Sequence, residues 1–332
     1  MGKNIGFDCG TNMLVSAVAD EEGAIQYKMQ RDAFYRISPK SQVNSNSIRT
    51  SLEKRGSNFI LNADGDFIVV GEDALEIAIE RNDVAKRPLR KGVLSSKEKD
   101  SLPMLKLIIE SLLGKGEKGD KVVYSVPARP VDGSFDIVYH TAMLELYLNG
   151  MGYEAQPINE AFAIALSELI EDGLSGICIS FGAGMVNTAV IHQGDPLVEF
   201  SLTRAGDYID DAVGKALDIS PSLVQLEKEA GIDLMNPKDK IGEAVSVYYS
   251  TLINYTISNI AFELEKRGKD LPMFRKPVPI VVSGGLSLAK GFVEKVNKSL
   301  EMLTFPIQIT EVRRAEDPMR AVATGALLGS QL

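Results

Sequence analysis

Two stretches of the sequence decide the fold: residues 5–18, IGFDCGTNMLVSAV, and residues 177–190, ICISFGAGMVNTAV. They align without gaps and share Ile5/Ile177, Gly10/Gly182, Met13/Met185, Ala17/Ala189 and Val18/Val190. Each copy has two apolar runs around a glycine, a pattern typical of a β-hairpin with a tight turn. Chance produces some matches between apolar segments. The separation by about half the chain nevertheless favours two duplicated domains.

The composition is that of a globular protein. The chain has 332 residues, of which 45% are hydrophobic and 24% charged, so two packed cores are expected. A net charge of −9 argues against a nucleic-acid-binding surface, because phosphate contacts need clustered Lys and Arg. Two cysteines are too few for a disulfide framework, and the sequence has neither a signal peptide nor a run of about 20 apolar residues. We therefore expect a cytoplasmic protein with no nucleic-acid partner and no membrane segment.

Strand-like and helix-like runs alternate along the chain, which predicts mixed-sheet α/β domains. Strands are expected at 121–126 and 279–282, and helices at 102–114, 135–150 and 242–266. We predict domain I over residues 1–160, with a small inserted subdomain at about 31–87. Domain II is predicted over residues 161–332, with an insertion at about 206–270.

Three glycine turns follow apolar strands, at Gly10, at Gly182–Gly184 and at Gly284–Gly285. Glycine at such a turn lets backbone N–H groups converge on an anion, because no Cβ blocks the approach. A single turn of this kind is most simply an ordinary hairpin turn. Three together, two of them in related hairpins, predict that a triphosphate is held between the hairpins.

Two carboxylates are candidates for chemistry beside these turns. Asp8 ends the first apolar strand, where it would face bound phosphates, so it implies Mg²⁺ between the like charges. The alternative is an Asp that caps the turn. Thr11 and Asn12 offer a hydroxyl and an amide to phosphate oxygens. Glu160 precedes an apolar helix, where it would either orient an attacking water or stabilise the N-terminus of the helix.

Five motifs together resemble the nucleotide-site motifs of the actin-like ATPase superfamily. They are IGFDCGTN from Ile5, PINEAFAIA from Pro157, SFGAGMVN from Ser180, VVSGGLSLAKG from Val281 and DPMRAVATGAL from Asp317. Within the superfamily the chain is most similar to the prokaryotic MreB and MamK proteins. Two further segments resemble segments of those proteins, namely RPLRKGVL from Arg87 and SLTRAGDYIDDAV from Ser201. The resemblance implies an α/β fold of duplicated, ribonuclease H-like domains, with ATP or ADP and Mg²⁺ in the cleft between them.

Carried over position by position, the resemblance assigns the site residues. The catalytic candidates are Glu160, Asp8 and Ser180, and Asp8 is also the metal candidate. The nucleotide-binding candidates are Gly10, Thr11, Asn12, Asn159, Gly182, Ala183, Gly184, Met185, Gly206, Asp207, Asp210, Glu227, Lys228, Gly284, Gly285 and Leu286. The register of the helix at Glu227 and Lys228 is open by one residue. Ala321–Ala326 matches the family's C-terminal connecting helix, where small residues let two helices cross.

The sequence departs from the family pattern in the second hairpin. Ser180 stands where the family usually has Asp, and Met185 stands where it has Thr. The first change removes a negative charge from the Mg²⁺ side, and the second removes a phosphate-donating hydroxyl. We therefore expect nucleotide binding with slow or impaired hydrolysis. A polar residue that the family has after the VP dipeptide at Pro127 corresponds here to Asp132 or Asp136.

The resemblance implies an ATPase that polymerises into cytoskeletal filaments through self-association. The alternative is a non-polymerising, nucleotide-dependent switch that docks unidentified protein partners. A small-molecule kinase on the same fold ranks below both, because the sequence carries no sugar-kinase signature.

Overall fold

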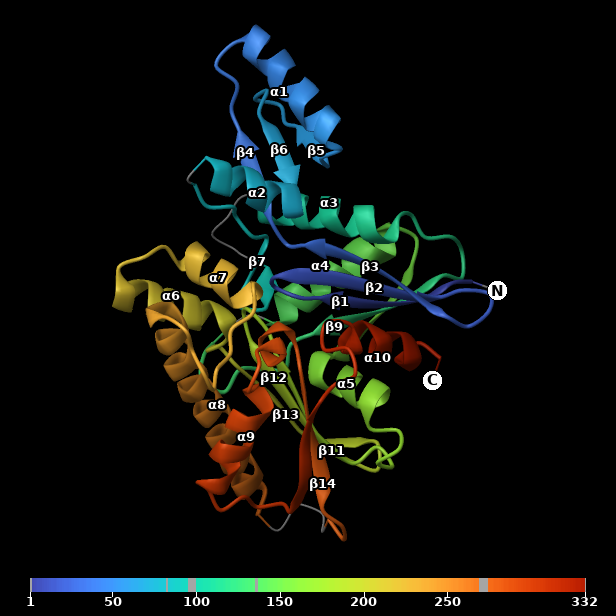
Figure 1. Ribbon diagram of the computed structural model, residues 1–332. Helices are drawn as coiled ribbons and strands as arrows, with labels where there is room; N and C mark the ends of the chain where they lie inside the picture. The colour runs from blue at the N-terminus through green and yellow to red at the C-terminus, as the bar shows by residue number, and fades with distance from the viewer. Residues whose placement is uncertain (1, 82, 95–99, 135–136, 269–273, 332) are drawn as a thin grey trace.

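Two five-stranded sheets of the same design organise the chain, in a computed structural model that describes residues 2–81, 83–94, 100–134, 137–268 and 274–331 (Figure 1). The first sheet contains β1 (Asn4–Cys9), β2 (Met13–Ala19), β3 (Ile25–Arg31), β9 (Lys121–Val126) and β10 (Glu154–Asn159), in the order β10-β9-β1-β2-β3. The second contains β11 (Gly176–Phe181), β12 (Val186–His192), β13 (Asp195–Leu202), β14 (Val278–Ser283) and β15 (Ile309–Arg314), in the order β13-β12-β11-β14-β15.

The two sheets repeat one topology, as the duplicated hairpins predict. In each sheet a meander of three antiparallel strands is extended by two parallel strands. The hairpins β1–β2 and β11–β12 hold equivalent positions, with Asp8 opposite Val15 and Ser180 opposite Asn187. The predicted α/β fold of duplicated domains is therefore confirmed.

The central strands are largely buried because helices cover both faces of the sheet. Every residue of β11 is buried. Its alternate side chains enter different cores, because successive residues of a strand point to opposite faces. Ile177 and Ile179 pack in the core under the outer helices, whereas Cys178 packs in the core between the two sheets.

Helices α5 (Glu160–Glu168) and α10 (Ala321–Gly329) lie between the two sheets and pack against each other (Figure 1). The chain's last helix thereby returns to β1 of the first sheet. The approach is so close that a Cβ added to Gly325 would lie 1.7 Å from the carbonyl oxygen of Ala163. A Cβ on Gly6 would likewise lie 2.0 Å from the carbonyl oxygen of Ala323. Small residues are what allow this crossing.

A small group of strands and helices follows the first sheet meander. It contains β4 (Phe34–Ile37), α1 (Gln42–Arg55), β5 (Phe59–Leu61), β6 (Phe67–Val70) and α2 (Glu72–Glu80). The three strands form an antiparallel sheet around Phe67 and Val69, with Leu52 from α1. Helix α1 was not expected, because its apolar content is low. Its ends are nevertheless marked, by the Ser41 hydroxyl that accepts from the Asn44 N–H and by Gly56 in the left-handed conformation.

A helical segment separates β13 from β14. It contains α6 (Gly206–Leu217), α7 (Pro221–Glu229) and α8 (Lys240–Arg267). Helix α8 is capped by Asp239, and its buried stripe is the one that the spacing of apolar residues predicts, namely Val245, Tyr249, Leu252, Ile253, Ile257, Ile260 and Leu264. This stripe covers the outer face of the second sheet together with α9 (Phe292–Glu301).

Two further helices cover the outer face of the first sheet, α3 (Ser101–Leu113) and α4 (Ile137–Gly150). The helix predicted from residue 135 begins with two residues that lie outside the described ranges. The remaining elements are the short hairpin of β7 (Leu89–Arg90) with β8 (Val93–Leu94) and the 3₁₀ turn η2 (Gly285–Leu288). Within the described ranges, no helix combines the length and the apolar character that crossing a bilayer requires.

Candidate functional site

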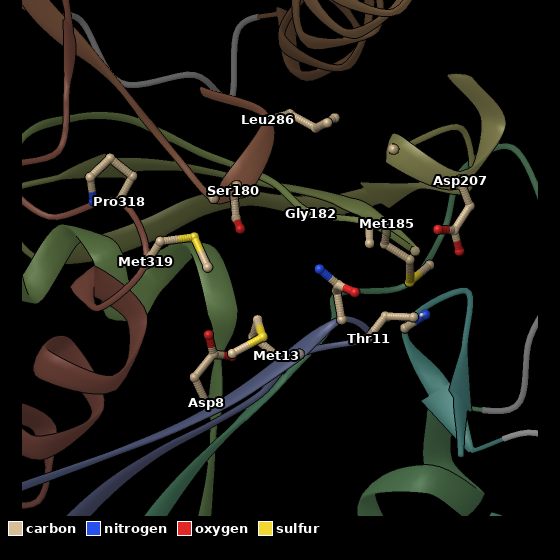
Figure 2. A pocket seen from close by; sticks show the side chains of 18 of the residues that line it. Asp8, Thr11, Met13, Ser180, Gly182, Met185, Asp207, Leu286, Pro318 and Met319 are labelled. Carbon is tan, nitrogen blue, oxygen red and sulfur yellow. Dashed lines mark hydrogen bonds between the residues drawn. The ribbon is translucent and has the colours of Figure 1, made fainter. Parts of the chain in front are cut away.

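A cavity of about 330 Å³ lies between the tips of the β1–β2 and β11–β12 hairpins. Figure 2 shows that Asp8 and Ser180 enter it from the two facing sheets. Leu286, Pro318 and Met319 form an apolar part of its wall. This size and this mixture of apolar wall and convergent polar groups are typical of small-ligand sites, whose volumes run from about 300 to 1,000 Å³.

The two hairpin tips touch each other at one side of the cavity. A Cβ on Gly184 would lie 2.5 Å from the Thr11 hydroxyl oxygen and 2.7 Å from the Gly92 backbone nitrogen, so only glycine fits there. The Thr11 hydroxyl accepts a hydrogen bond from the Gly92 N–H at 3.1 Å, which leaves its own proton to donate. The third turn contributes Gly284, whose φ of 82° is a conformation that other residues rarely adopt. All three predicted glycine turns line the cavity.

Asp8 is the first of two buried carboxylates in the cavity. Its Oδ1 accepts a hydrogen bond from the Ser125 hydroxyl at 2.8 Å, and the Ser125 oxygen in turn accepts from the Cys9 N–H. Burial raises the pKa of Asp8 to about 6, and the bond from Ser125 opposes this shift. Ser125 was not singled out in the sequence, although it lies in the predicted strand directly before the VP dipeptide.

Glu160, at the start of α5, is the second buried carboxylate. Its Oε2 accepts a hydrogen bond from the Asn187 amide at 2.8 Å. Burial raises the pKa of Glu160 to about 8, the charge of Asp8 adds to the shift, and a hydrogen bond from the Ser180 hydroxyl opposes it. Asn159, the preceding residue, caps α5 by accepting from the Phe162 N–H at 3.0 Å. The helix end is thus capped by Asn159, and Glu160 lines the cavity.

Glu160 makes the stability of the ligand-free protein depend on pH. Its folded-state pKa lies above its unfolded value, so its stabilising contribution is complete below about pH 4.5 and is lost as the pH rises through about 8. We expect the free energy of unfolding of wild type, relative to that of a Glu160→Gln variant, to fall between pH 5 and pH 8. Urea titrations of both proteins at four pH values measure this difference, and parallel profiles would contradict the raised pKa.

The pair of carboxylates fits a divalent cation bound with few protein ligands. The described residues hold no group of three or more His, Cys, Asp or Glu side chains that would enclose a metal. Mg²⁺ is commonly bound through one or two carboxylates, with waters and phosphate oxygens completing its shell. A buried carboxylate whose pKa is raised by desolvation, as that of Asp8 is, gains from a nearby positive charge.

Residues 3–330 match the protein family described as volactin. The chain belongs to the volactin family. No curated protein sequence matches it.

Solved structures of several proteins share the fold of this chain. The MamK double helical filament matches with a TM-score of 0.70 and 20% identity, covering 99% of this chain and 98% of that one. MreB 5 of Spiroplasma citri bound to AMPPNP matches with a TM-score of 0.66 and 18% identity, covering 98% and 95%. The ethanolamine utilization protein EutJ from Carboxydothermus hydrogenoformans matches with a TM-score of 0.56 and 14% identity, covering 99% of this chain and 90% of that one. The actin-like fold predicted from the sequence is therefore confirmed.

Most of the predicted site residues line the cavity, and two do not. Asn159 is the helix cap described above, and Glu227 is exposed on α7. The structure corrects the register of α7: Gln225, Lys228 and Glu229 share the face toward the cavity, as the helical repeat of 3.6 residues requires. Lys228 pairs with Asp210 at 2.8 Å and donates to the carbonyl oxygen of Gly206 at 3.1 Å.

Two ion pairs join distant segments of the chain beside the cavity. Arg31, on β3, donates from both terminal nitrogens to the two carboxylate oxygens of Glu229 on α7, at 3.1 and 3.0 Å. Asn12, predicted as a phosphate donor, takes part in this network by donating to Glu229 and accepting from Arg31. Arg87 pairs with Asp207 at 2.9 Å. No pattern in the sequence marks Arg31 or Glu229, because their partners are distant in the chain.

The two acidic candidates after Pro127 have different outcomes. Asp132 accepts from the Thr203 N–H at 2.8 Å and from the Tyr255 hydroxyl at 3.1 Å, and it does not line the cavity. Asp136 lies outside the described residues. Asp132 therefore has a structural role between the segment after β9 and helix α8.

Proposed function

We propose that this protein binds ATP with Mg²⁺ in the cavity, hydrolyses it slowly and polymerises into filaments. One observation carries the proposal: the glycine-containing tips of the β1–β2 and β11–β12 hairpins contact each other beside the buried carboxylates of Asp8 and Glu160. Backbone N–H groups from both tips suit a phosphate chain, and the carboxylates suit its cation. The likeness to MreB 5 bound to AMPPNP and to the MamK filament supports both parts of the proposal.

The cavity offers a different environment to each part of a nucleotide. The tips at Gly10–Asn12 and Gly182–Met185 suit the phosphates. The paired Asp210 and Lys228 offer polar groups for a ribose, and the wall around Leu286 and Met319 offers apolar area for a base. A nucleoside triphosphate would therefore span the cavity from its polar to its apolar side.

Glu160 is the residue we assign to the attacking water. Its carboxyl group is buried in the cavity and accepts from Asn187, so it is fixed where a water beside the last phosphate would donate to it. Mg²⁺ bound beside Asp8 would supply positive charge that neutralises the phosphates and favours the ionised form of Glu160. Ser180 brings no carboxylate and Met185 brings no hydroxyl to the phosphates, in contrast to the Asp and Thr of the actin-like pattern. We therefore assign slow hydrolysis to this site.

Replacing Asp8 with Ala is expected to weaken Mg²⁺-dependent ATP binding by about 10- to 100-fold, the usual cost of losing a partner of a metal's shell. Calorimetric titration with ATP, with and without Mg²⁺, measures the change. An Asp64→Ala variant, which removes an exposed turn carboxylate far from the cavity, is the control. Equal affinities of the Asp8 variant and wild type in the presence of Mg²⁺ would remove Asp8 from the metal site.

Sedimentation tests the filament part of the proposal. We expect the protein to pellet at high speed with ATP and Mg²⁺ and to stay in the supernatant with ADP, with filaments visible by electron microscopy in the pellet. A protein that binds ATP tightly but never pellets is instead the nucleotide-dependent switch.

We infer a cytoplasmic location, because Cys9 and Cys178 are both free thiols.

A further inference from the structure

The side chain of Asn187 joins three separate segments of the chain at the edge of the cavity. It lies on β12, directly opposite Ser180 of β11, and it is 1% exposed. Its Nδ2 donates to Oε2 of Glu160 at 2.8 Å, and its Oδ1 accepts from the Ala128 N–H at 3.1 Å. These contacts link the second sheet, the start of α5 and the segment that follows β9.

The orientation of the Asn187 amide follows from these two partners. A backbone N–H can only donate, so the group that faces Ala128 must be the amide oxygen. The amide NH₂ is then turned to Glu160, and no flipped arrangement satisfies both contacts. An aspartate in this position has no proton to give at neutral pH, so it would leave Glu160 facing a second negative charge. Asparagine is the isosteric residue that satisfies both neighbours.

Ala128 is itself held against the second sheet. The Ser201 hydroxyl donates to the Ala128 carbonyl oxygen at 2.8 Å, and Pro130 forms an isolated bridge with Ser201 on β13. The amide oxygen of Asn187 therefore contacts backbone that is held in place. Its amide nitrogen contacts the side chain of Glu160, which has rotatable bonds. Of the two groups that Asn187 contacts, Glu160 is the one whose position depends on the contact.

We propose that Asn187 is a positioning residue that holds the carboxyl group of Glu160 toward the attacking water. The inference rests on the proposed ATPase function. Ser180 lies directly opposite Asn187 on β11 and also lines the cavity. We assign the contact with the carboxyl group of α5 to Asn187 and leave the phosphates to the backbone of the tips.

Steady-state ATP hydrolysis by Asn187→Ala and Asn187→Asp tests the proposal. We expect kcat to fall on the order of tenfold in both variants, because small misplacements of a reacting group are costly, while KM stays within about threefold of wild type. Thr188→Val is the matched control: Thr188 is the next residue on β12, is fully buried, and its hydroxyl has no hydrogen-bond partner among the described residues. It should keep the wild-type kcat.

A double-mutant cycle separates positioning from a general structural effect. If Asn187 acts through Glu160, adding Asn187→Ala to Glu160→Gln lowers kcat no further. A further tenfold loss in the double variant, or a change in KM with kcat intact, would overturn the proposal.

A crystal structure of the Asn187→Ala variant tests the positioning role without any measurement of ATP hydrolysis. We expect the carboxyl group of Glu160 to leave its wild-type position while Ala128 stays in place. An unmoved Glu160 would overturn the positioning role. A wild-type protein that hydrolyses no ATP would contradict the proposed function, and the crystal structure would still report on Asn187.

Discussion

Replacing Glu160 with Gln is expected to slow ATP hydrolysis by about 100-fold or more, the size of a general-base contribution. Glutamine keeps the shape of the side chain and the contact with the Asn187 amide, but it cannot accept a proton from water. The affinity for ATP should stay within a few-fold of wild type, because the cavity keeps its walls. Single-turnover hydrolysis and equilibrium binding, measured on the same preparation, separate the two effects.

The matched control for this variant is Glu168→Gln. Glu168 lies at the other end of α5 and pairs with Arg313, away from the cavity. It should hydrolyse ATP at the wild-type rate. If Glu160→Gln and Glu168→Gln are equally active, Glu160 is only a carboxylate at a helix start, and the water must be activated elsewhere.

Replacing Gly325 with Ala is expected to destabilise the protein by about 3 kcal/mol, near the upper end for overpacking a core. The new Cβ would lie 1.7 Å from the carbonyl oxygen of Ala163, and this neighbour is backbone that cannot rotate away. Helices α5 and α10 would have to separate. The cost exceeds the gain of about 1 kcal/mol that alanine brings to a helix in place of glycine.

Gly329→Ala is the control on the same helix. Its Cβ would meet only the ends of the Ile158 and Leu166 side chains, at 3.3 Å. These side chains can move, so its stability should stay within about 1 kcal/mol of wild type. Urea unfolding of both variants measures the difference. Equal midpoints would mean that the helices cross less tightly than the structure has them.

The sequence predicted those parts of the site that depend on local patterns. A glycine after an apolar strand predicts a turn wherever it occurs, so Gly10, Gly182 and Gly284 were found, and Asp8 and Ser180 with them. The motif at Glu160 was found in the same way. The buried stripe of α8 follows from spacing alone. The domain boundaries at residue 160 and at the two insertions stay predictions.

The rest of the site depends on contacts between distant segments, which local patterns do not encode. Arg31 and Glu229 are ordinary surface residue types until the fold brings β3 and α7 together. The face of α7 depends on how that helix docks, so Glu227 was chosen in place of its neighbour Glu229. The role of Asn187 has no signature in the sequence, because a single asparagine in an apolar strand follows no recognisable pattern.

The ion pairs of Arg31 with Glu229 and of Arg87 with Asp207 connect segments that belong to opposite halves of the molecule. All four side chains are partly accessible to water, with exposed fractions between 11% and 36%. Dissolved ions screen such pairs, and they do so more strongly as salt concentration increases. Raising the ionic strength is therefore expected to weaken the contacts that Arg31 and Arg87 make between the two halves of the molecule, whether or not a ligand is bound.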